Sequence, residues 1–85
     1  MKAQDEGVCG RNIAWVSASN GDVPPDAIIF GTTVEGEKLY MGRVFHDGTL
    51  TPGKIHPSHG VCYIPYGGQE LSFSEYEVLI DYKPM

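Results

Sequence analysis

Short runs in which apolar and polar residues alternate, separated by turn-forming residues, occupy most of the chain from residue 12 onward. A period of two is typical of strands that bury one face, and no window places apolar residues at helical spacing over three turns. Strands are expected at residues 13–17, 27–30, 38–45, 49–55, 61–66, 71–73 and 76–82. The pattern predicts an all-β fold, a small antiparallel β-sandwich of about seven short strands.

Glycine-containing turns set the limits of these strands. Asp47-Gly48 is the strongest hairpin signal, because both residues tolerate the positive φ angles of a tight type I′ turn. Glu35-Gly36-Glu37 and Gly67-Gly68 are expected to reverse the chain as well. Pro24-Pro25 excludes helix and holds the chain extended into residues 27–30, an apolar run suited to a strand that is buried on both faces.

Two strands carry charged side chains whose environment the pattern predicts. In residues 38–45, Arg43 shares a face with apolar neighbours, so its guanidinium is expected to be paired or stacked. In residues 49–55, Pro52-Gly53 interrupts the pattern, because proline cannot donate to a ladder and glycine permits a bulge or a close approach. We expect the backbone to bend there and to turn Lys54 toward histidines and tyrosines that line a polar pocket.

The length limits how much surface the chain can bury by itself. Its 85 residues form one small domain, which buries about 60–65% of the surface that the unfolded chain exposes. Residues 1–11 show no periodicity and are expected to form a flexible tail, which leaves a single domain at residues 12–85. Cys62 is expected to be a small buried residue and Cys9 a loop residue, with a bridge between them as the less favoured alternative. Association between chains is therefore the expected additional support.

The charge balance argues against several classes of partner. Eleven acidic residues oppose six Lys and Arg residues, which gives a net charge of −5. The basic residues are not clustered, so no nucleic acid is expected as a partner. The longest apolar runs are too short to span a membrane, and no signal peptide is visible. The sequence predicts a soluble protein without a transmembrane segment and does not fix its location, although it favours the cytoplasm or secretion without a signal peptide over classical secretion.

Several motifs follow one another along this pattern. In order they are Trp15, Pro24-Pro25-Asp26-Ala27-Ile28, Leu39-Tyr40-Met41-Gly42-Arg43, Pro52-Gly53-Lys54, Tyr63-Ile64-Pro65-Tyr66-Gly67-Gly68 and Tyr76-Glu77-Val78-Leu79. Together they cover residues 13–80, and their combination is specific although no single motif is. This succession resembles the DM-nine (DM9) repeat family.

The resemblance implies a β-sandwich protein that binds carbohydrate. Members of the family usually carry tandem repeats, and they include mannose-recognising lectins of invertebrate innate immunity and the lectin-like portion of natterin-like pore-forming toxins. This chain has a single repeat, so the resemblance implies that copies associate about a two-fold axis as a homodimer. The implied function is a lectin-like module with a pattern-recognition role, whose ligand is mannose or a mannose-containing glycan.

The resemblance also implies which residues bind the sugar. In lectin members an early acidic residue and the lysine of the Pro-Gly-Lys motif hold its hydroxyls. The lysine corresponds to Lys54, whereas the acidic position falls on Thr33, and loss of that carboxylate removes a charge-assisted hydrogen bond of about 1.5–3 kcal/mol. Glu35 and Asp26 are the nearby candidates to replace it. His56 belongs to the loop that follows Lys54 and is a candidate contact for the ligand or the partner chain.

Metal binding, catalysis and assembly are the alternatives to sugar binding. His56 and His59 form an H-x-x-H pair, but zinc requires further ligands and the cysteines lie at no ligand-like spacing, so no metal site is expected. No nucleophile elbow or glycine-rich cofactor loop is present, so we expect neither an enzyme nor a cofactor. The remaining alternative is a structural or assembly module with a lapsed sugar site, cut from a longer tandem-repeat or toxin-like protein.

Overall fold

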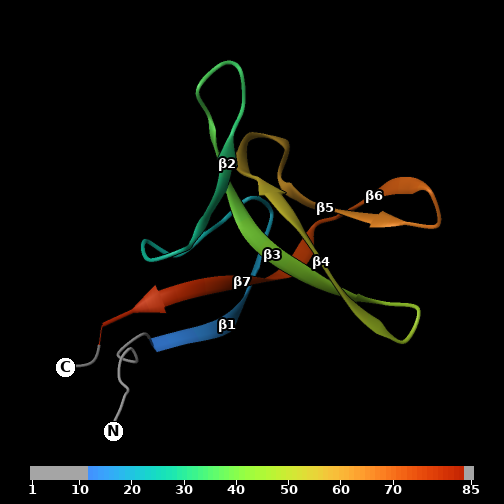
Figure 1. The fold of residues 1–85 in the computed structure, drawn as a ribbon, viewed down its shortest axis with the longest axis horizontal. Helices are drawn as coiled ribbons and strands as arrows, with labels where there is room; N and C mark the ends of the chain where they lie inside the picture. Colours follow the sequence, from blue (N-terminus) through green and yellow to red (C-terminus); the bar gives the residue numbers. More distant parts are fainter. Residues whose placement is uncertain (1–11, 84–85) are drawn as a thin grey trace, which may run out of the picture.

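The computed structural model describes residues 12–83, and most of them lie in β-strands (Figure 1). The strands are β1 (Asn12–Ser19), β2 (Ile29–Thr32), β3 (Lys38–His46), β4 (Thr49–His56), β5 (Val61–Tyr66), β6 (Gln69–Phe73) and β7 (Glu75–Tyr82). A 3-10 turn, η1 (Pro57–His59), connects β4 to β5. The predicted all-β antiparallel fold with seven strands is confirmed. The predicted tail, residues 1–11, lies outside the described residues.

All seven strands belong to one antiparallel sheet. Its order is β1-β7-β3-β4-β5-β6, and β2 pairs with β3 beside this path. Figure 1 shows the β3–β4 hairpin, the β5–β6 hairpin and the β2–β3 turn extending in different directions from a common centre. Strands β5 and β7 are not hydrogen-bonded neighbours, yet residues of both strands belong to one hydrophobic core. The sheet therefore bends back on itself. The layers expected of a sandwich are thus two parts of a single curved sheet.

The core lies on the inner face of this curved sheet. Its buried members are Val44, Ile55, Cys62, Ile64, Tyr76 and Val78. Tyr76 also carries a polar group into the core, where its hydroxyl donates to the carbonyl of Asp22 (2.9 Å) and accepts from the amide of Gly21 (2.8 Å). Both bonds fasten the loop after β1 to β7, and they satisfy the hydroxyl that burial would otherwise leave unpaired.

The predicted turns are confirmed by their backbone angles. Asp47 and Gly48 have φ angles of 54° and 79°, as a type I′ hairpin requires, and Gly67 and Gly68 have φ angles of 59° and 79°. Gly36 has a φ angle of 94° in the turn between β2 and β3. These hairpins fix the register of β3 against β4 and of β5 against β6.

The prediction of a doubly buried strand at residues 27–30 is wrong. Strand β2 begins at Ile29, and the side chains of Ile29 and Phe30 are 51% and 55% exposed. Strand β2 pairs with β3 alone, so it has no second neighbour to cover it. An apolar run of this length does not distinguish an edge strand from a central one.

The residues just before β2 fill a gap between two strands. Strands β3 and β7 pair at two positions and then separate. Beyond them Ala27 forms a bridge with Ile80, while the amide of Ile28 donates to the carbonyl of Leu79 (3.0 Å). The carbonyl of Ile28 accepts from the amide of Met41 (2.9 Å). This long-range arrangement, which no local pattern reveals, sets where β2 begins.

Of the two features that the sequence allows at Pro52-Gly53, a bulge or a close approach, the structure shows the close approach. The register between β3 and β4 is continuous from Thr49 to Ile55, without a bulge. Gly53 instead permits the close approach that was the other reading of the motif, because a Cβ at this position would overlap the carbonyl oxygen of Tyr63. Strand β5 pairs with β4 only from Lys54 onward. No residue of β5 is therefore paired with Pro52, and the amide hydrogen that proline lacks is not needed for a hydrogen bond to β5.

Candidate functional site

A row of side chains crosses five strands on the outer face of the sheet. Lys54 of β4 pairs with Met41 of β3 and with Tyr63 of β5, and Trp15 of β1 pairs with Leu79 of β7. A residue adjacent in sequence to each of them packs in or against the core. Because successive side chains of a strand point to opposite faces, this row lies on the face that is turned away from the core.

The row forms most of a pocket of about 500 Å³, which we call the Lys54 pocket. Phe30, Pro52, Pro65 and Glu70 complete its rim. The expectation of a polar pocket lined by histidines and tyrosines is wrong, because the lining is largely apolar and includes Tyr63 but no histidine. Lys54 and Glu70 bring the charged groups. An apolar hollow with a few convergent polar groups is the usual form of a small-ligand site.

The two charged groups of the Lys54 pocket are loosely paired. The ammonium nitrogen of Lys54 lies 3.5 Å from Oε2 of Glu70, and the two side chains are 40% and 56% exposed. Charge-assisted hydrogen bonds in proteins are shorter, at about 2.7–2.9 Å. The pair therefore leaves hydrogen-bonding capacity on both partners.

Paired strands hold both groups in place. Strand β4 pairs with β3 on one side of Lys54 and with β5 on the other, so Lys54 lies within the sheet and not at its edge. Glu70 is opposite Pro65 because the two-residue turn at Gly67-Gly68 sets the register of β5 against β6. Neither group depends on a long loop for its position.

The other four candidate ligand-binding residues lie outside the Lys54 pocket. The hydroxyl of Thr33 accepts from the amide of Glu37 (3.1 Å) and helps to close the β2–β3 turn, where Glu35 is exposed. The carbonyl of Asp26 accepts from a β7 amide, and His56 is bound to Glu37. The structure thus does not bring these four residues together with Lys54 in one pocket, and their contact with a sugar stays a prediction.

A second polar group, which we call the Glu37 cluster, consists of Glu37, His56, Ser58, His59 and Tyr63. Oε1 of Glu37 accepts from the Ser58 hydroxyl (2.7 Å) and lies 2.8 Å from Nε2 of His56, while Oε2 accepts from the Ser58 amide (2.8 Å). The His59 ring stacks on His56 with centroids 3.5 Å apart, and its Nδ1 lies 2.7 Å from the Tyr63 hydroxyl. The cluster fastens the β2–β3 turn to η1.

Hydrogen bonding sets the charge state of this cluster. The bonds from the side chain and backbone of Ser58 lower the pKa of Glu37, and His56 adds to the effect. An ionised carboxylate only accepts hydrogen bonds, so Nε2 of His56 is the donor toward it. Residues 12–83 contain no group of three or more His, Cys, Asp or Glu side chains arranged to hold a metal ion.

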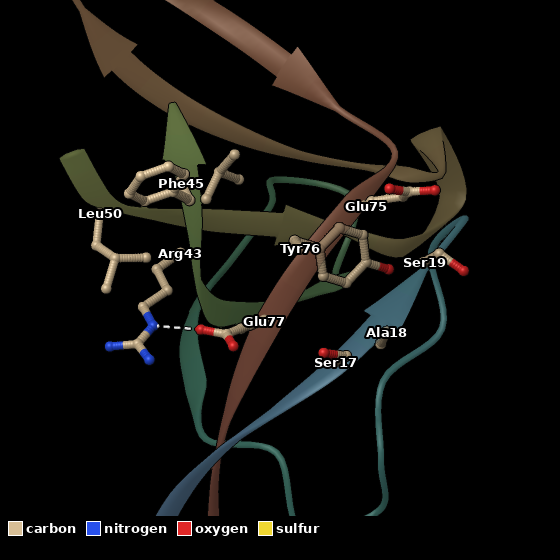
Figure 2. Close-up of a pocket in the computed structure, with 10 residues that line it drawn as sticks. Ser17, Ala18, Ser19, Arg43, Phe45, Leu50, Glu75, Tyr76 and Glu77 are labelled. Carbon is tan, nitrogen blue, oxygen red and sulfur yellow. Dashed lines mark hydrogen bonds and ion pairs between the residues drawn. The ribbon is translucent and has the colours of Figure 1, made fainter. Parts of the chain in front are cut away.

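Figure 2 shows a second hollow, of about 560 Å³, between β1, β7 and the β3–β4 hairpin. Within it, Nε of Arg43 lies 2.6 Å from Oε1 of Glu77. The Arg43 guanidinium carbon also lies 4.2 Å from the centroid of the Trp15 ring. The prediction that Arg43 is paired or stacked is confirmed in both forms. Because Arg43 and Glu77 bind each other closely, this hollow is less suited to polar ligands than the Lys54 pocket is.

Cys62 is a free thiol that is fully buried in the core. Burial raises the pKa of this thiol to about 11. The prediction of a small buried residue is confirmed, whereas Cys9 lies outside the described part of the chain.

Glu70 and Trp15 line the site, although the motif reading did not assign them to it. For Glu70 the sequence does hold a signal. The Gly67-Gly68 turn places Glu70 opposite Pro65, and Pro65 shares a strand face with Tyr63, two residues away, which is the partner of Lys54. For Trp15 no local signal exists, because its place beside the pocket depends on the pairing of β1 with β7.

Comparison with known proteins gives two matches. The model of a family described as DM9 repeat matches residues 6–73. Natterin-3 of Thalassophryne nattereri is 32% identical over 69 residues, which are 81% of this chain and 16% of natterin-3. The chain therefore spans a small part of the length of that relative. In the described region no helix has the length and apolar character needed to cross a bilayer.

Proposed function

This chain belongs to the DM9 repeat family, and we propose that it is a carbohydrate-binding module of the lectin type. The observation that carries the proposal is the partly exposed side chain of Lys54, whose ammonium belongs to an apolar pocket on the outer face of the sheet. The family match and the similarity to natterin-3 support a lectin-like or related module. Mannose or a mannose-containing glycan as the ligand, and pattern recognition as the role, are the finer parts of the proposal.

The chemistry of the pocket suits a pyranose. Adjacent hydroxyls of a sugar accept and donate hydrogen bonds, and the Lys54 ammonium donates up to three. The C–H face of the ring can pack on Trp15, Met41 and Leu79, which form the apolar lining. The proposal is one of binding alone and contains no catalytic step.

We also propose that two copies associate as a homodimer. Large apolar side chains are exposed on the single chain, among them Phe45 at 69% and Leu50 at 47%, and such groups mark contact surfaces when they gather. Two sites on one assembly offset weak single-site affinity by avidity. Sedimentation equilibrium should give twice the mass of the chain, and a monomer at every concentration would contradict the proposal.

The test of sugar binding is a calorimetric titration with methyl α-mannoside and with mannan. We expect the wild type to bind and Lys54→Ala to lose binding, because the ammonium supplies the hydrogen bonds to the sugar. Lys38→Ala is the matched control, since Lys38 is an exposed lysine on β3 outside the pocket. Equal binding by the wild type and Lys54→Ala, or no binding by the wild type, would contradict the proposal.

One observation favours the alternative of an assembly module without sugar binding. Thr33 stands at the acidic position of the lectin members, and its hydroxyl serves to close a turn. A wild type that binds no sugar, together with a Thr33→Asp variant that gains affinity for mannoside, would establish this alternative.

A further inference from the structure

A carboxylate that the motifs did not assign to the site, that of Glu70, lies beside Lys54. The acidic position of the lectin members falls on Thr33, outside the Lys54 pocket, whereas Glu70 lines the pocket itself. We propose that Glu70 is the carboxylate of the sugar site, and that Lys54 and Glu70 form a clamp with no net charge that selects uncharged sugars. This inference rests on the proposed function and names the ligand class of the same site.

The geometry of the pair leaves room for a ligand. At 3.5 Å the Lys54 ammonium and Glu70 Oε2 attract each other without forming a short charge-assisted bond. Among residues 12–83, Lys54 is the one ionic or hydrogen-bonding partner of the Glu70 side chain. A pair of adjacent sugar hydroxyls can therefore accept from the ammonium and donate to the carboxylate, which satisfies both groups.

The ion pair between Lys54 and Glu70 contributes little to the stability of the fold. Both side chains are more than a third exposed, and ion pairs with such exposure contribute little to stability. The β5–β6 hairpin that carries Glu70 already has its register set by the Gly67-Gly68 turn. A variant without the Glu70 charge should thus fold as the wild type does.

Charge decides which sugars fit. Glu70 balances Lys54 within the pocket, and the whole chain carries a net charge of −5. The carboxylate of a uronic or sialic acid would come to lie beside the Glu70 carboxylate, whereas a neutral hexose brings no charge. Rejection by a like charge is a common source of specificity, so the ligand class is uncharged hexoses with adjacent free hydroxyls.

The test titrates the wild type and Glu70→Gln with methyl α-mannoside and with methyl glucuronide. We expect Glu70→Gln to bind the mannoside at least about tenfold more weakly, because it loses a charge-assisted acceptor. It should also bind the glucuronide more tightly than the wild type does, because the Lys54 ammonium is no longer neutralised. Glu75→Gln, at an exposed carboxylate outside the Lys54 pocket, should change neither affinity.

The outcomes separate this inference from the proposed function. If Glu70→Gln binds both sugars as the wild type does while Lys54→Ala loses the mannoside, the clamp is wrong and the proposed function stands. If Lys54→Ala also binds as the wild type does, both are wrong. Coinciding melting curves of all variants and the wild type show that the affinities report on the pocket and not on unfolding.

Discussion

Glu37 and Glu70 both lie beside basic side chains, and their surroundings differ. Glu37 uses both carboxylate oxygens in bonds of 2.7–2.8 Å to Ser58 and His56, and its side chain is 28% exposed. Glu70 has one contact, at 3.5 Å to Lys54, and is 56% exposed. A carboxylate whose acceptor sites are filled by its own chain stabilises structure, whereas one with free acceptor sites is available to a ligand.

The elements that carry the two glutamates explain the difference. Glu37 follows a turn and faces η1, and neither segment has ladder bonds to fix one against the other, so side chains do so. Glu70 lies within a hairpin whose five pairs already fix its place. The Glu37 cluster therefore connects the β2–β3 turn to η1, whereas strand pairing alone positions the residues of the Lys54 pocket.

The largest effect is expected from Gly53→Ala, which disturbs both regions. An added Cβ would overlap the Tyr63 carbonyl oxygen, and backbone cannot move aside as a flexible side chain does. We expect the free energy of unfolding to fall by more than about 3 kcal/mol, as measured by urea denaturation. Gly31→Ala is the matched control, because no atom lies within 4 Å of its added Cβ. Equal urea midpoints for the two variants would contradict the close approach of β4 and β5.

A smaller effect on stability is expected when either glutamate is replaced by alanine, and it should differ between Glu37 and Glu70. Glu37→Ala should lower the melting temperature clearly, because it leaves the Ser58 amide and hydroxyl and the His56 ring without their shared acceptor. Glu70→Ala should leave the melting temperature unchanged within error, because its exposed pair contributes little. Circular dichroism melts at neutral pH provide the measurement. A comparable loss in both variants would remove the distinction on which the account rests.

The smallest effect is the pH dependence that Glu37 confers. Its pKa is lower in the folded chain than the ordinary value of 4.5, chiefly because Ser58 donates hydrogen bonds to it. The stability that it contributes is therefore complete above pH 4.5 and is lost as the pH falls through the folded pKa. Glu37→Gln should reduce the loss of stability on acidification, and Ser58→Ala should reduce it in part. Identical slopes of stability against pH in the wild type and Glu37→Gln would show that the cluster does not hold the carboxylate.

Local signals predicted the turns and the strand pattern of this fold. Asp47-Gly48 and Gly67-Gly68 specify hairpins by their own backbone preferences, and period-two alternation predicted an all-β fold of about seven strands. The family motif directed attention to Lys54, which lies in a pocket. Each of these features depends on a few residues that are close together in the chain.

The sequence failed, or left a choice open, where distant strands decide the outcome. Whether residues 27–30 are buried depends on how β3 and β7 separate, and that geometry is set by residues far away in sequence. Pro52-Gly53 permits either a bulge or a close approach, and the nearness of β5 selects the latter. The place of Glu70 in the pocket was missed because its neighbour Lys54 belongs to another hairpin. The registers of β4 against β5 and of β5 against β6 together bring the two residues near each other.

The most direct test of the central claim is an NMR titration of the ¹⁵N-labelled protein with methyl α-mannoside. We predict that the largest amide shifts occur at Met41, Lys54 and Glu70, which line the Lys54 pocket, with much smaller shifts at Glu37 and Ser58. Shifts concentrated at Glu37, Ser58 and the β2–β3 turn, with the amides of Met41, Lys54 and Glu70 unmoved, would contradict the claim.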